Sequence, residues 1–137
     1  AEGTYAVGRE KIREFARAVH AEHLFHYDVE AARAAGYADV IAPPTFAIIL
    51  AQAADAALIN DESAGIDFSR VVHADQRFTH HRPIVAGDEL RTEVHVDSLR
   101  VMGAGAMLTT REEITDAAGE PVATCISSLL VRAEEGN

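Results

Sequence analysis

The feature that most constrains the fold of this chain is an apolar segment at residues 45–59 that directly follows two prolines. Proline disrupts a helix interior but suits a first turn, so Pro43 and Pro44 predict a helix that begins just after them. Within the segment, only Gln52 and Asp55 interrupt a run of Ala, Ile, Leu and Phe. A helix with so little polar surface must be covered by other elements, and it is too short and alanine-rich to span a bilayer.

The rest of the chain supplies the cover. Four segments with strand patterns follow the helix, at residues 71–80, 90–97, 106–115 and 121–132, and a weaker strand pattern lies at residues 5–7. Short connections between the four imply antiparallel pairing. This order of elements predicts one domain over residues 1–137 with an α+β, single hot-dog fold. In that architecture a curved antiparallel sheet of about five strands wraps a long central helix.

Two shorter helices are expected before the prolines. Residues 8–19 have apolar positions at helical spacing, and Asp28 and Gly36 suit the two ends of a helix at residues 29–35. Four cations lie off the apolar face of the first helix: Arg9, Lys11, Arg13 and Arg17. They form either a solvated helix surface or a local patch for the phosphates of coenzyme A or phosphopantetheine.

Composition excludes several classes of partner. The formal net charge is -10, which argues against nucleic acid and against an anionic membrane surface. The sequence has no apolar run of about 18 residues and no signal-peptide pattern, so the cytoplasm is the expected location. Cys125 is the single cysteine and is expected in the core. No glycine-rich nucleotide motif is present, and no cofactor is expected.

Seven histidines are many for this length. His20, His23 and His26 match no strong zinc spacing, so no metal is expected. A second group comprises His73, His80, His81 and His95. His73 and His81 are separated by an even number of positions, which predicts that they share a face of their strand unless a bulge intervenes. These histidines lie either on the sheet surface or a dimer interface, or one of them lines a substrate groove.

Residues 26–42 and 77–90 resemble the MaoC-like hydratases and dehydratases. That family places an Asp-x-Asn-Pro-x-His motif before a short helix, and Ile-Ala at the start of the central helix. The Ala-Pro-Pro-Thr-Phe form looks like the subgroup that includes accessory subunits of (3R)-hydroxyacyl-ACP dehydratase heterodimers. The resemblance implies a dimer and an Asp/His acid–base pair, with a backbone N–H at the helix start that binds the enolate oxygen.

The sequence keeps only part of this machinery. His26 falls on the family histidine and is the predicted catalytic residue. The family aspartate position is Ala21, and the helix-start glycine maps to Pro44, which has no N–H. The resemblance implies a substrate-binding group made of His23, Tyr27, Thr45 and Phe46.

These departures leave three functions open. The chain is a dehydratase or hydratase subunit of fatty-acid metabolism that acts with a MaoC-like catalytic partner, or a self-sufficient homodimeric hydratase. The self-sufficient enzyme uses His26 together with Glu22 or His23. The third function is a non-catalytic acyl-thioester-binding protein. The expected ligand is an acyl-CoA or acyl-ACP thioester. The alanines of the central helix indicate room for an acyl tail, although close helix–sheet packing explains them equally well.

Overall fold

The structure is a computed structural model that describes residues 4–59, 71–103 and 105–132. The expected loop at residues 60–67 and the tail at residues 133–137 lie outside the described residues. The elements, in chain order, are β1 (Tyr5–Ala6), α1 (Arg9–Ala18), the 3₁₀ helix η1 (Leu24–His26), α2 (Val29–Ala34), α3 (Ile48–Ile59), β2 (Val71–His80), β3 (Glu89–Met102), β4 (Gly105–Thr115) and β5 (Pro121–Arg132). None of these helices has both the length and the apolar run that a membrane crossing requires.

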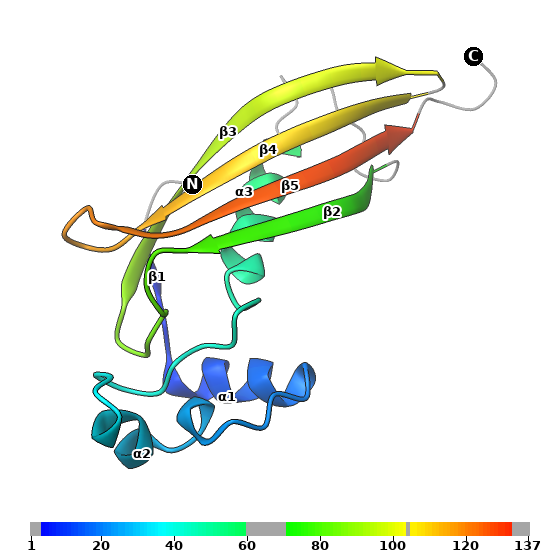
Figure 1. The fold of residues 1–137 in the computed structure, drawn as a ribbon. Coiled ribbons are helices and arrows are strands. Elements are labelled where there is room, and N and C mark those ends of the chain that lie inside the picture. The colour runs from blue at the N-terminus through cyan, green and yellow to red at the C-terminus, as the bar shows by residue number, and fades with distance from the viewer. Residues whose placement is uncertain (1–3, 60–70, 104, 133–137) are drawn as a thin grey trace.

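The five strands form one antiparallel sheet in the order β1-β3-β4-β5-β2. The sheet curls over α3, and α1 and α2 form a separate layer beyond the N-terminal end of that helix (Figure 1). The predicted hot-dog architecture is therefore confirmed. β4 and most of β5 alternate between buried and partly exposed residues, as strands of a half-buried antiparallel sheet should.

The side of α3 that meets the sheet consists mainly of small residues. Ala51 and Ala54, with Ala47 just before the helix, are at most 1% exposed, whereas Gln52 and Ala53 on the other side are exposed. The helix begins at Ile48, three residues later than predicted. The preceding residues form tight turns, because the N–H of Phe46 binds the carbonyl of Pro43 and the N–H of Ile48 binds that of Thr45.

The N-terminal layer follows its sequence signals. α1 ends where His20 adopts a left-handed conformation, with φ of 60°. The Asp28 side chain accepts the N–H of Ala31 and caps α2, and Gly36 has a φ of 102°, as both residues predicted. Phe15 of α1 packs edge-on against Phe46 with ring centroids 5.4 Å apart, which joins this layer to the core around α3.

The bulge that the expectation for β2 left open is present. The register of β2 against β5 shifts between His73 and Asp75, so His73 and His81 do not share a face. His73 pairs with Leu129 and His80 pairs with Ala123, so those two histidines lie on the face of the sheet that carries the buried Leu129 and Ala123. The bulge has a physical reason: Val71 and Phe78 are an odd number of residues apart, yet both pack on the inner face.

A buried polar cluster interrupts the apolar contact between α3 and the sheet. Thr110 and Glu112 are fully buried and Asp55 is 6% exposed. The Thr110 hydroxyl donates to Asp55 Oδ1 at 2.8 Å and lies 2.9 Å from Glu112 Oε1. One hydroxyl hydrogen cannot serve both carboxyl groups, so the second contact requires a protonated carboxyl. Burial, followed by the proximity of Asp55, raises the pKa of Glu112 to about 8, which identifies it as the protonated group.

The proton on Glu112 makes folding stability depend on pH. Between its unfolded pKa of about 4.5 and its folded pKa of about 8, the folded protein holds a proton that the unfolded chain releases. The contribution of Glu112 to the free energy of unfolding is therefore full below pH 4.5 and falls by up to about 1.4 kcal/mol per pH unit through this window. We expect E112Q to flatten that slope in urea unfolding measured from pH 5 to pH 8. The exposed Glu120 provides the control E120Q, and an unchanged slope in E112Q would contradict the assignment.

Candidate functional site

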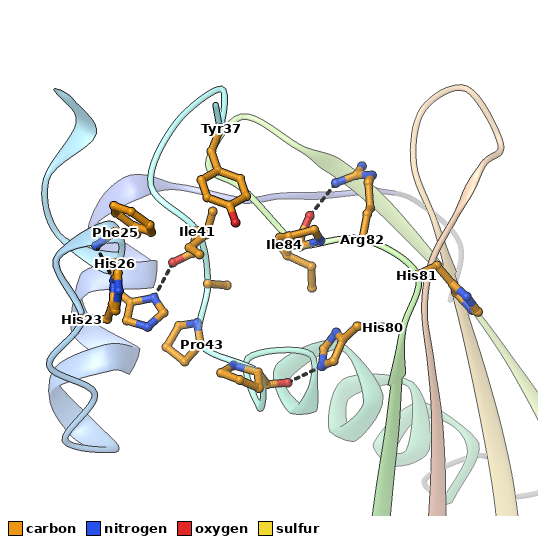
Figure 2. A pocket seen from close by; sticks show the side chains of 13 residues that line it. His23, Phe25, His26, Tyr37, Ile41, Pro43, His80, His81, Arg82 and Ile84 are labelled. Atoms are coloured by element: carbon orange, nitrogen blue, oxygen red, sulfur yellow. Dashed lines mark hydrogen bonds between the residues drawn. The ribbon is translucent and has the colours of Figure 1, made fainter. Parts of the chain in front are cut away.

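A cavity of about 700 Å³ lies where the N-terminal layer meets the start of α3 and the end of β2 (Figure 2). Its lining combines apolar side chains with ionisable ones: His23, Phe25, His26, Tyr37, Ile41, Ala42, Pro43, Pro44, His80, His81, Arg82, Pro83 and Ile84. No carboxylate is among these lining residues, although the chain as a whole carries a net charge of -10. Imidazoles are therefore the natural proton-transfer groups of this cavity near neutral pH.

His26 is held rigidly at the end of the 3₁₀ helix. Its side chain is 8% exposed, and its Nδ1 lies 2.7 Å from the carbonyl oxygen of Ile41. The backbone reinforces this contact, because the N–H of Ile41 binds the carbonyl of Phe25 at 2.9 Å. A carbonyl oxygen only accepts hydrogen bonds, so Nδ1 carries the hydrogen and Nε2 of the neutral ring has a free lone pair. His26 can thus accept a proton at Nε2 without losing its anchor.

His80 is anchored in the opposite sense. Its Nε2 lies 2.7 Å from the carbonyl oxygen of Pro44, so Nε2 carries the hydrogen and Nδ1 has the free lone pair in the neutral ring. From the sequence, one histidine of the second group was a candidate to line a substrate groove, but the pattern did not indicate which one. The β2 bulge brings His80 to the inner face, and Figure 2 shows the dashed line of this hydrogen bond starting from the labelled His80.

The loop between these histidines is fixed by strand-like contacts and an ion pair. Ile41 forms a β-bridge with Val85, and the N–H of Ala42 binds the carbonyl of Ile84 at 2.7 Å. Just before the loop, the single Nε–H of Arg9 is shared between the two carboxylate oxygens of Asp39, at 3.0 and 3.1 Å, and Arg9 Nη2 donates to Oδ2 at 2.8 Å. Hydrogen bonding to Arg9 holds the pKa of Asp39 below its usual range. The ion pair therefore ties the loop to α1 at neutral pH.

Arg82 also lines the cavity, and its positive charge is compensated by neighbouring carboxylates. Its guanidinium binds both carboxylate oxygens of Asp88, at 2.9 and 3.1 Å, and reaches Asp116 at 3.3 Å. The hydrogen bond to Asp88 raises the pKa of Arg82 further. This arginine stabilises the turn that carries Ile84 to Asp88.

The structure separates the predicted site residues into two groups. His26 and His23 line the cavity, and His23 Nδ1 accepts the N–H of Phe25. Tyr27, Thr45 and Phe46 are not among the lining residues. The Tyr27 hydroxyl donates to the backbone carbonyl of Ala21, Thr45 is exposed, and Phe46 is fully buried in the core. The catalytic and substrate-binding roles of all five residues remain predictions.

Ala21 occupies the position of the family aspartate, so this position carries no carboxylate. Ala21 is half-buried, and the neighbouring Glu22 is exposed and does not line the cavity. Three cations of α1 form ion pairs with carboxylates of the same chain: Arg9 with Asp39, Lys11 with Glu14, and Arg13 with Glu10. This pairing favours the solvated-surface interpretation of the basic helix. Across the described ranges, no group of three or more His, Cys, Asp or Glu side chains is placed to hold a metal ion.

The curled sheet, the covered helix and the imidazole-lined cavity define a MaoC-like hot-dog protein of the hydratase and dehydratase type. The chain belongs to the family described as the FAS1-like dehydratase domain region, whose sequence model matches residues 1–125. A UPF0336 protein of Saccharopolyspora erythraea is 56% identical over 128 residues, covering 93% of this chain and 82% of the relative. A UPF0336 protein of Leifsonia xyli subsp. xyli is 54% identical over 131 residues, covering 96% and 88%.

Solved structures show the same fold. A chain of the C-terminally truncated HadBC (3R-hydroxyacyl-ACP dehydratase) complex of Mycobacterium tuberculosis is similar with a TM-score of 0.84 and 35% identity. The similarity covers 95% of this chain and 91% of that one. The R-hydratase PhaJ1 of Pseudomonas aeruginosa has a TM-score of 0.74 and 19% identity, covering 98% and 80%, and supports the fold alone.

The two anchored histidines should show opposite tautomers. In long-range ¹⁵N–¹H correlation spectra above the titration range of both rings, we expect the Nδ1–H form for His26 and the Nε2–H form for His80. The carbonyls of Ile41 and Pro44 impose these forms. The same tautomer in both rings would contradict the geometry. H26Q and H80Q, each lacking one set of ring signals, provide the assignments.

Proposed function

We propose that this chain is a subunit of a MaoC-type hydro-lyase that binds a 2-enoyl or (3R)-3-hydroxyacyl thioester of CoA or acyl carrier protein and works with a MaoC-like catalytic partner in fatty-acid metabolism. The observation that supports this most directly is the pairing of an anchored His26 with a cavity that has no carboxylate. The family membership supplies the reaction class. The HadBC complex offers a precedent for a multi-subunit dehydratase acting on a hydroxyacyl thioester.

The chemistry explains why a partner is needed. Adding water across C2=C3 of an enoyl thioester requires a base for the water and a proton source for C2, with a donor for the developing enolate oxygen. His26 Nε2 can serve as the base. The family carboxylate is replaced by Ala21, and Pro44 has no N–H to donate at the helix start. A partner that carries the complete Asp/His pair would supply the main turnover while this chain completes the dimer.

A second arrangement is a homodimer in which this chain's own cavity turns over the thioester. The fixed tautomer of His26 favours it, because the free lone pair of a base is already presented. Of the two proposed helpers, Glu22 is exposed outside the cavity, and His23 lines it. A pure acyl-thioester-binding protein is the outcome if neither arrangement gives turnover.

The first test is turnover by the purified chain, with and without a co-expressed MaoC-like catalytic subunit. Loss of the enoyl-thioester absorbance of crotonyl-CoA or crotonyl-ACP measures hydration. We expect weak or no turnover by the chain alone and restoration by the partner. Full turnover alone that is abolished in H26A but kept in E22Q would instead establish the homodimer. A chain that binds no acyl thioester in either state would reject the proposed function.

A gain-of-function variant tests the missing carboxylate. We expect A21D to raise the hydration rate of the isolated chain at least about tenfold, because it restores a carboxylate at the family position. A21N is the matched control, since it has the same shape without the charge. Equal rates in the two variants would show that the absence of this carboxylate does not limit the reaction.

A further inference from the structure

His26 and His80 act on the same short stretch of backbone. One ring donates to the carbonyl at its start, Ile41, and the other to the carbonyl at its end, Pro44, both at 2.7 Å. They come from η1 and from the end of β2, and Figure 2 shows them on opposite sides of Pro43. The cavity therefore has an anchored imidazole on each side.

These anchors persist when the rings change charge. An imidazolium donates from both nitrogens, so protonation at the free nitrogen leaves each bond to a backbone carbonyl in place. His26 can gain or lose a proton at Nε2, and His80 at Nδ1, without moving the loop. Such a pair can exchange protons with a bound molecule from a fixed geometry, which general acid–base catalysis requires.

The His80 side chain is open both to the cavity and to solvent. Its ring stacks beside Phe78 with centroids 6.1 Å apart, and its side chain is solvent-exposed. The other ionisable groups that line the cavity are His23, His26, Tyr37, His81 and Arg82. Arg82 is compensated by Asp88 and Asp116, and His81 bonds Thr124 Oγ1 at 3.2 Å. No carboxylate in the lining competes for the proton on His80.

We propose that His80 is the second proton-transfer residue of this cavity and takes the place of the family carboxylate absent at Ala21. This inference rests on the second arrangement of the proposed function, in which the chain's own cavity turns over the thioester. In the reactive form, His26 is neutral and His80 is an imidazolium.

The proton balance of hydration is complete with these two rings. His26 Nε2 takes a proton from water as the oxygen bonds to C3, and the π electrons of C2=C3 move onto the thioester as an enolate. The enolate then takes the Nδ1 proton of His80, forming the C2–H bond. His26 ends protonated and His80 neutral, and exchange with solvent restores both. Dehydration runs through the same states in reverse.

The test compares H80Q with H73Q in the purified full chain. Glutamine at position 80 keeps an N–H donor for Pro44 but cannot act as a proton donor near neutral pH. His73 lies on the same strand and the same face but outside the cavity lining. In the second arrangement the wild type hydrates crotonyl-CoA without a partner, and its turnover is the reference for both variants. We expect H80Q to lower kcat roughly 100-fold or more relative to that reference, with KM within about threefold. H73Q should stay within about twofold of the wild type.

Binding of butyryl-CoA, which lacks the double bond, separates failure of this inference from failure of the proposed function. Turnover in H80Q equal to that in H73Q would overturn the role of His80 and leave the hydro-lyase proposal intact. Butyryl-CoA binding with no turnover by the isolated wild type would also overturn it, and would favour the partner-dependent arrangement. Neither binding nor turnover would overturn both.

Discussion

The close approach of the sheet to α3 is the contact on which the structure depends. Alanines on the covered side let the strands pack directly against the helix backbone, with Ala51 fully buried. The burial of these alanines agrees with the packing interpretation. The cavity described above is lined by loop residues, the end of β2 and the turn before α3, and no residue of α3 is among its lining residues.

That arrangement places the site at a junction of three parts of the fold. The 3₁₀ helix supplies His26, the turn before α3 supplies backbone carbonyls, and the end of β2 supplies His80. Each part is secured elsewhere, for instance by Arg9 and Asp39 between α1 and the loop. A site assembled from separately secured elements can hold its geometry without a bound ligand, which is the condition for electrostatic preorganisation.

Local patterns predicted much of the fold. The proline pair predicted the central helix, and Asp28 and Gly36 predicted the ends of α2. Alternation of apolar and polar residues predicted the strands. Each of these signals depends only on neighbours in sequence. The start of α3 at Ile48 was missed, since turn and helix differ there only in hydrogen-bond pattern. Resemblance identified His26. His80 could not be singled out, because its contact with Pro44 joins residues 36 positions apart. The contact also depends on which face of β2 carries His80.

The bulge in β2 lets both ends of this strand place an apolar side chain on the inner face of the sheet. Val71 packs with Leu108 and Leu129 at one end, and Phe78 packs on the main core at the other. Loss of a single residue between them would force one end to turn its apolar side chain to solvent. Insertions and deletions in this strand are therefore constrained by both cores at once. The length of the segment between Val71 and Phe78 is therefore set by the need to keep both side chains on the inner face.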